Sequence, residues 1–184
     1  VVKVVFDVGS PGPTYAMGHA HCDALSFECF IDGEPWVVNC GTYAYQDESR
    51  LRYKATLSHN TILLDGTEQH ECWSAFRVAR YSVAEIEAVS DTAACGVFFQ
   101  RRTQSAIHRE ISIEKDAIRI VDSVGVSSKM ESAVIFAYGV PELNGYFASV
   151  DYSPEFGEVC RAIRVVREAN GVLETVLHFP VKRK

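Results

Sequence analysis

A chain of 184 residues with a formal net charge of −6 can bury one good core and is too acidic for a nucleic-acid scaffold, which needs a broad basic surface. Hydrophobic residues make up 47% of the chain and no low-complexity run occurs, which excludes a disordered protein. No apolar stretch reaches the length of a bilayer, so we expect no insertion into a membrane.

Short runs of alternating or continuous apolar residues dominate the chain. They cover residues 25–31, 34–39, 61–64, 105–113, 117–124, 132–138, 162–168 and 172–179. Between them stand tight-turn signals, namely Asp32-Gly33, Asp65-Gly66 and Asn170-Gly171, which suit the positive φ angles of short turns. Hardly any segment holds a helical period for three turns. The pattern predicts an all-β fold, an antiparallel, two-layer, supersandwich-like β-sandwich with little helix.

Two stretches lack this pattern and are predicted to be irregular. Residues 9–18 hold two prolines and three glycines, and residues 44–58 are polar and charged. No internal repeat or linker is evident. We therefore expect one domain over residues 1–184.

The six cysteines carry no C-x-x-C spacing, which excludes a zinc ribbon and a dithiol redox motif. They are Cys22, Cys29, Cys40, Cys72, Cys95 and Cys160. A domain of this size does not need disulfides, so we expect mostly free, buried thiols.

The segment G-H-A-H-C-D places His19 and His21 one residue apart. On a strand the two side chains would share a face. Asn39 and His59 stand at predicted strand ends, and His21, Asn39 and His59 would offer two imidazole nitrogens and one amide oxygen to a zinc ion, with water completing the site. The alternative is that all are ordinary polar residues and that each histidine bonds to a backbone carbonyl.

Other residues permit a functional and a structural interpretation. His19 and Tyr43 can transfer protons, although a tyrosine at a sandwich edge more often serves packing. His70, in E-Q-H-E, is predicted to be an exposed turn residue, whereas His108 and His178 lie in strand patterns and are predicted to be structural.

Four motifs occur in a specific order over the first two thirds of the chain. They are F-D-V-G-S-P-G-P-T-Y-A-M-G-H-A-H-C-D-A-L-S-F, I-D-G-E-P-W-V-V-N-C-G-T-Y-A-Y, S-H-N-T-I-L-L-D-G-T-E-Q and H-R-E-I-S-I. This order resembles the C-terminal β domain of the heparinase II/III-like polysaccharide lyases. The resemblance implies a longer protein, in which an N-terminal α/α-toroid and this β-sandwich enclose an acidic polysaccharide and cleave it at a uronic acid by β-elimination.

Carried over to this chain, the resemblance places His19 and Tyr43 on the wall of the substrate cleft. It makes His21 and His59 two ligands of a zinc site and puts the third ligand at Asn39. The family usually reads D-P-G-T-Y where this chain reads N-C-G-T-Y, so an amide replaces the acidic ligand and zinc binding is weakened unless Cys40 or Asp23 substitutes.

Arg50, Arg52 and Arg77 can position a polyanionic chain, although solvated surface charges are the common alternative. Without its toroid the domain is expected to be inactive. A carbohydrate-binding or scaffolding sandwich without catalysis stays open as the second function. The resemblance implies a periplasmic or secreted location, whereas the unpatterned cysteines also fit a reducing cytoplasm.

Overall fold

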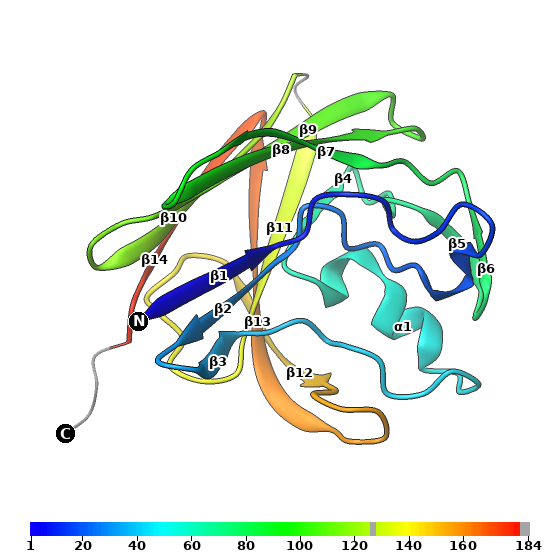
Figure 1. Cartoon of the computed structure of the whole chain (residues 1–184), viewed down its shortest axis with the longest axis horizontal. Helices are drawn as coiled ribbons and strands as arrows, with labels where there is room; N and C mark the ends of the chain where they lie inside the picture. The colour runs from blue at the N-terminus through cyan, green and yellow to red at the C-terminus, as the bar shows by residue number, and fades with distance from the viewer. Residues whose placement is uncertain (126–127, 181–184) are drawn as a thin grey trace.

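The computed structural model describes residues 1–125 and 128–180. Its two large sheets face each other, with most of the smaller sheet above β1 and β2 in the view of Figure 1. The larger sheet runs β1 (Val2–Phe6), β2 (Phe27–Ile31), β3 (Glu34–Val37), β11 (Lys129–Phe136), β13 (Cys160–Asn170), β12 (Tyr146–Tyr152), and β4 (Ile62–Leu64) also pairs with β11. The smaller sheet runs β14 (Val172–His178), β10 (Ala117–Val124), β9 (Ser105–Ile113), β8 (Ala93–Gln100), β7 (Ala84–Val89).

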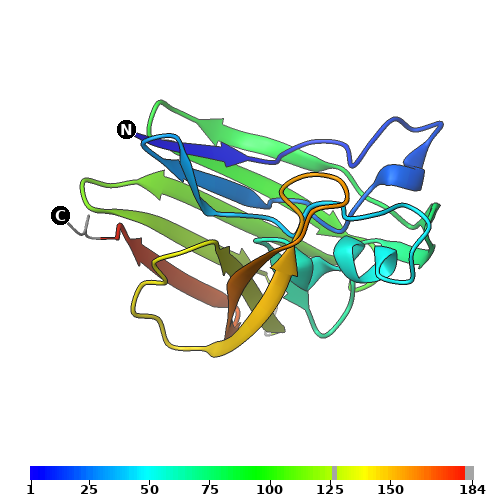
Figure 2. The ribbon, with the colours of Figure 1, turned by 90° about the horizontal axis from the view of Figure 1, so that it is seen from below.

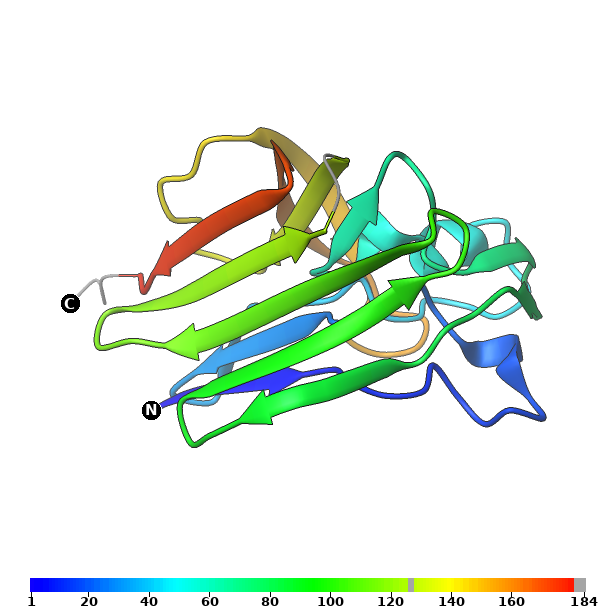
Figure 3. The same cartoon turned by 90° about the horizontal axis from the view of Figure 1, so that it is seen from above.

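The ladders between these strands are antiparallel, which confirms the predicted all-β sandwich. A separate two-stranded hairpin, β5 (Glu71–Ser74) and β6 (Arg77–Ala79), lies at one end of the molecule. Figure 3 has the smaller sheet in front, and Figure 2 shows the opposite side. In the part of the chain that the structure describes, no helix is long and apolar enough to cross a membrane.

The main core forms where the inner faces of the two sheets meet. Phe27, Trp36 and Phe136 come from the larger sheet, and Ile111 and Ile118 from the smaller one. All five side chains are buried because successive residues of a strand point to opposite faces, so every second residue meets the other sheet. This packing explains why apolar residues alternate in the sequence of these strands.

The predicted tight turns occur, but they do not all make hairpins. Asp32 and Gly33 both have positive φ, 52° and 92°, and join β2 to β3 in one ladder. Asn170 and Gly171 also reverse the chain, yet β13 pairs with β11 and β12, whereas β14 pairs with β10 in the other sheet. A turn signal specifies a reversal of direction and not the strands that pair on either side of it.

Short helices interrupt the two stretches predicted to be irregular. They are η1 (Met17–His19), α1 (Arg50–Lys54) and η2 (Thr56–Ser58). α1 covers the outer face of the larger sheet, where Tyr53 packs with Val38, Ile135 and Ala162. The segment with His19 and His21 is therefore η1 followed by a loop and not a strand.

A buried ion pair joins the two sheets. Arg109 on β9 and Asp122 opposite it on β10 are both fully buried, and the Arg109 Nε and Nη2 atoms lie 2.7 and 3.0 Å from the two carboxylate oxygens. Nη2 also donates to Ser132 Oγ on β11 of the larger sheet, at 3.1 Å. Nη1 donates to the backbone carbonyls of Leu25 and Asn60. The guanidinium thus holds strands of both sheets and two loop segments.

Replacing Arg109 by methionine should lower the free energy of unfolding by about 3–5 kcal/mol, because it leaves the Asp122 carboxylate buried without its partner. The double variant Arg109→Met, Asp122→Leu should recover part of this loss. Urea unfolding followed by circular dichroism measures both. Arg119→Met on β10, which removes an exposed pair with Glu174, is the matched control and should change little. A single variant as stable as the parent would contradict this role of the pair.

Candidate functional site

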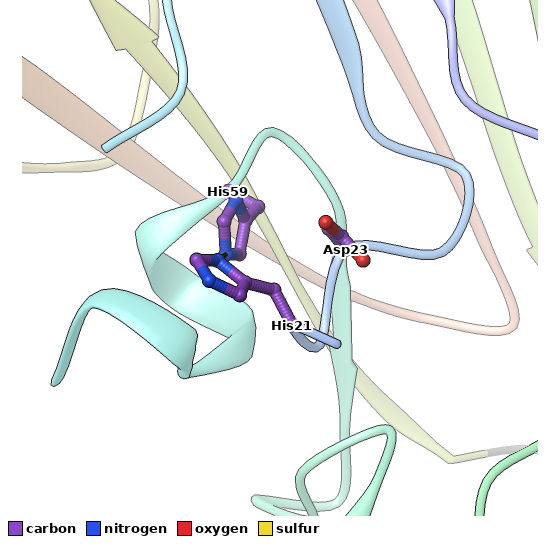
Figure 4. A group of neighbouring side chains, drawn as sticks. All are labelled: His21, Asp23 and His59. Carbon is purple, nitrogen blue, oxygen red and sulfur yellow. Dashed lines mark hydrogen bonds between the residues drawn. The ribbon is translucent and has the colours of Figure 1, made fainter. Parts of the chain in front are cut away.

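Two histidines and one aspartate meet on a wall formed by the loop after η1 and the end of η2. His21 Nδ1 lies 3.3 Å from His59 Nε2. One ligand atom each of His21, Asp23 and His59 lies within 4.8 Å of the others (Figure 4). The structure therefore brings together the predicted pair His21 and His59, and Asp23 supplies the carboxylate beside them.

Burial keeps both imidazoles neutral. Desolvation, followed by the nearby His59 and the cations of Arg50 and Lys54, lowers the pKa of His21 from 6.5 to about 2. Desolvation lowers the pKa of His59 to about 4, against the opposing effect of the Tyr53 backbone carbonyl. Neutral imidazole is the form that binds a metal ion, so at neutral pH neither ring has to lose the proton of the imidazolium form first.

Burial acts in the opposite direction on the carboxylate. Desolvation raises the pKa of Asp23 to about 6, so Asp23 is ionised at neutral pH and takes up a proton in mild acid. Above about pH 6 the cluster therefore offers two imidazole nitrogens and one ionised carboxylate oxygen to a metal ion.

Arg50 completes a chain of hydrogen bonds with the histidines. Its Nη1 atom lies 2.7 Å from His21 Nε2 and 3.2 Å from Thr42 Oγ1. Since a guanidinium only donates, His21 Nε2 is the acceptor, and His21 Nδ1 carries the proton that it donates to His59 Nε2. In this arrangement the side chains satisfy one another.

The same three side chains form a group that could hold a metal ion. The His21 Nδ1 and His59 Nε2 atoms lie 3.3 Å apart, close enough for both to bind one ion, and nitrogen ligands of this kind suit zinc. Asp23 would supply the third, anionic ligand. A metal ion on His21 Nδ1 would require the imidazole proton on Nε2, which faces the Arg50 Nη1 donor at 2.7 Å, so Arg50 would have to give up this contact and keep Thr42 and the His19 carbonyl as acceptors.

Asn39, the predicted third ligand, has other partners. Its Oδ1 atom accepts from the Asn60 backbone amide at 3.1 Å, and its Nδ2 atom donates to Glu28 at 2.9 Å. Asn39 thereby holds the residue next to His59. Cys40 is buried in the cluster of Tyr53 and Ile135. Of the two substitutes considered for the missing acidic ligand, Asp23 is the one in the group with the histidines.

His19 and His21 do not share a face, because they are not on a strand. His19 is exposed at the end of η1, and its ring meets the edges of Tyr45 at 5.1 Å and Phe76 at 5.8 Å. Tyr43, the aromatic expected beside it, is half-buried and stacks on Tyr53 at 6.3 Å. The sequence analysis missed Tyr45, which stands two residues after Tyr43 in T-Y-A-Y.

The three predicted substrate arginines differ in surroundings. Arg50 is 1% exposed and faces His21 from α1, whereas Arg52 lies over the Tyr53 ring and 3.8 Å from Asp151. Arg77 is exposed and lies over the Trp73 ring. Of these three, Arg52 and Arg77 face solvent.

Lys54, four residues after Arg50 on α1, was not predicted. It is fully buried, and its Nζ atom donates to the Gly18 and Ala75 carbonyls at 3.2 Å each. One ammonium group thereby ties η1 to the turn between β5 and β6.

The comparisons with known proteins agree with this architecture. The family described as "Heparinase II/III-like, C-terminal" matches residues 2–175. The chain belongs to this family. No curated protein matches it at a significant level.

Solved structures show the same fold for this heparinase II/III-like domain. A heparinase III with methylated lysines matches with a TM-score of 0.69 and 16% identity over 99% of this chain and 33% of its own. The heparan sulfate lyase HepC from Pedobacter heparinus matches with a TM-score of 0.68 and 15% identity over 100% of this chain and 34% of its own. The heparinase II/III-like domain thus spans about a third of these longer chains.

His70 corrects one prediction for the heparinase II/III-like domain. It is fully buried, not exposed, and its ring meets the Phe98 ring edge-on at 5.7 Å. Desolvation lowers its pKa to about 4. The polar neighbours in E-Q-H-E suggested a turn, but His70 lies directly before β5 and Gln69 beside it is buried too.

Replacing His70 by phenylalanine should flatten the loss of stability in acid. The folded pKa of about 4 lies below the unfolded value of 6.5, so the neutral ring stabilises the fold above pH 6.5 and this contribution is lost as the pH falls toward 4. The variant should lose on the order of 2 kcal/mol less than the parent between pH 7 and 4.5. Urea unfolding across this range measures the slope. The exposed His178→Gln is the control, and equal slopes for His70→Phe and the parent would refute the prediction.

Zinc titration distinguishes the two candidate carboxylate positions in the heparinase II/III-like domain. Asp23→Asn should weaken zinc binding more than about tenfold, since even the loss of a residue that only hydrogen-bonds to a metal ligand costs about that much. Asn39→Asp should gain little, because Asp23 already supplies the charge. Calorimetry and metal content after dialysis report binding without any assay of activity. A steep gain in Asn39→Asp with no loss in Asp23→Asn would assign the ligand to position 39.

Proposed function

We propose that this domain forms one wall of the substrate cleft of a lyase that cleaves uronate-containing polysaccharide by β-elimination. The observation that carries the proposal is His19, an exposed imidazole between Tyr45 and Phe76, next to the buried group of Arg50 and His21. An exposed proton-transfer group beside aromatic rings suits a sugar bearing a carboxylate. The family and the fold support the same reading.

β-Elimination needs a group that stabilises charge as the proton next to the carboxylate leaves. His19 would donate a hydrogen bond to the uronate carboxylate and stabilise the developing enolate. Arg50 fixes the backbone of this residue, because its Nη2 atom donates to the His19 carbonyl at 3.5 Å. Tyr43, which stacks on Tyr53 and not on His19, would be a second proton-transfer group of the cleft, and Arg52 and Arg77 would attract the polyanion.

Zinc held by His21, Asp23 and His59 would supply a fixed positive charge and join the loop after η1 to the end of η2. We assign it a structural contribution to the wall, because it would join two segments that carry its ligands. Asn39 would support His59 through Asn60.

The remainder of the cleft would come from a helical domain. The matching solved chains are about three times as long as this one, which supports additional domains. We expect the isolated β domain to be inactive and the lyase to work in the periplasm or outside the cell, where such polysaccharides occur.

The full-length protein should release unsaturated, ultraviolet-absorbing products from at least one member of a panel of uronate polysaccharides. His19→Ala should lower kcat by about 10²–10⁴-fold, the range of proton-transfer catalysis. His178→Ala, on the exposed side of β14, is the matched control and should keep full activity. Absence of product from every polysaccharide, or full activity in His19→Ala, would refute the proposal.

A carbohydrate-binding role without catalysis is the second candidate. The exposed rings of Tyr45 and Phe156, 5.3 Å apart, favour it because such rings stack on sugars. Calorimetry with uronate oligosaccharides separates the two functions, since a binding module gives heat that Tyr45→Ala abolishes but no unsaturated product.

A further inference from the structure

We propose that Cys22 and Cys72 form a disulfide that links the loop of the candidate site to the β5–β6 hairpin. Their Sγ atoms lie 3.8 Å apart, in direct contact. A bond requires about 2.05 Å, so the sulfurs must approach by less than about 2 Å. Elsewhere in the described residues no other pair of cysteine sulfurs is in contact, and Cys95 Sγ instead donates to Glu87.

The two cysteines lie on different segments, the loop after η1 and strand β5. Cys22 is fully buried, and its backbone amide donates to the Lys54 carbonyl at 2.9 Å. Cys72 lies on β5, which pairs with β6 and with neither large sheet. The Lys54 ammonium also ties the hairpin to η1 through the Ala75 and Gly18 carbonyls. A covalent bond at Cys22 and Cys72 would add to this noncovalent attachment.

The hairpin lies close to η1 as well. A Cβ atom added at Gly18 would meet the Phe76 carbonyl oxygen at 3.1 Å and Phe76 Cβ at 3.3 Å. This approach places Phe76 against His19. Fixing β5 therefore fixes one of the two rings that flank His19.

The position of Cys22 gives the bond a consequence for the site. Cys22 stands between His21 and Asp23, two members of the candidate metal group. A disulfide to β5 restricts the loop that carries both side chains. It thereby preorganises the site in an oxidising environment.

The oxidation can proceed by thiol–disulfide exchange with a small disulfide such as oxidised glutathione. The half-buried Cys72, whose pKa the hydrogen bond from Cys22 and the Lys54 ammonium lower, attacks one glutathione sulfur as the thiolate. The glutathione S–S bond breaks and one glutathione leaves as a thiol. Cys22 then loses its proton, attacks Cys72 Sγ in the mixed disulfide and releases the second glutathione. Two protein thiols are oxidised and one glutathione disulfide is reduced.

Peptide mapping tests the bond in the full chain after equilibration with mixtures of reduced and oxidised glutathione. We expect one cross-linked peptide pair that contains Cys22 and Cys72, and the loss of two of the six free thiols. Hydrogen exchange should slow in residues 71–79 of the oxidised protein. Cys95→Ser is the matched control and should form the same cross-link, whereas Cys72→Ser should not.

The variant Cys22→Ser tests the proposed order of steps, because it should trap the mixed disulfide. Without its resolving partner, Cys72 should hold one glutathione as a stable mixed disulfide, and circular dichroism verifies that the variant is folded. Free thiols at both positions in the oxidised, folded parent would overturn the proposal. A persistent mixed disulfide at Cys72 in the parent would overturn it as well, because Cys22 would then fail to resolve it.

Discussion

The buried guanidinium of Arg109 is the interaction on which the sandwich and its site both depend. A charge inside a protein is tolerated only when every donor finds a partner, and here Asp122, Ser132 and two backbone carbonyls supply them. Those carbonyls belong to Leu25 and Asn60, which follow Asp23 by two residues and His59 by one. The group that joins the sheets therefore also fixes the position of the site loops.

The backbone of Leu25, one of the residues that Arg109 binds, also adopts an unusual conformation. Leu25 adopts a φ of 59°, a left-handed conformation that is unfavourable for a leucine, and its carbonyl accepts from Arg109. Asn60 acts in parallel, because its side chain bridges the Phe27 and Val38 carbonyls and accepts from the Ile135 amide. Polar side chains thus replace sheet hydrogen bonds where strands end at the site, which leaves the half-buried His21 close to the buried His59.

Burial also explains why the basic residues of α1 have different surroundings. The helix has only five residues, and Arg50 and Lys54 stand one turn apart on its inner face, whereas Arg52 lies over Tyr53 on another side. Together with desolvation, these two cations lower the pKa of His21, and Lys54 also ties η1 to the turn between β5 and β6. In the sequence the three positive charges look equivalent, because five residues are too few to show a helical period.

The sequence by itself determined the all-β class, many of the strands and the partnership of His21 with His59, whereas β1, β5, β6, β7, β8 and β12 were not predicted. Alternation of apolar residues located β9 and β10 at their observed bounds, because every second residue of a strand with one buried face is apolar. The ordered motifs identified the family, and they placed His21 and His59 in one site. Apolar alternation is a local pattern, and the family motifs are short continuous stretches of sequence. Both can therefore be recognised without a structure.

Only the tertiary structure decided which polar groups lie inside and what they face. It buried His70, put His19 beside Tyr45 instead of Tyr43, and selected Asp23 as the carboxylate near the histidines. It also divided β13 and β14 between two sheets despite the tight turn between them. These outcomes depend on contacts between segments far apart in the chain, and the free energy of burying a polar group is set by those neighbours and not by adjacent residues.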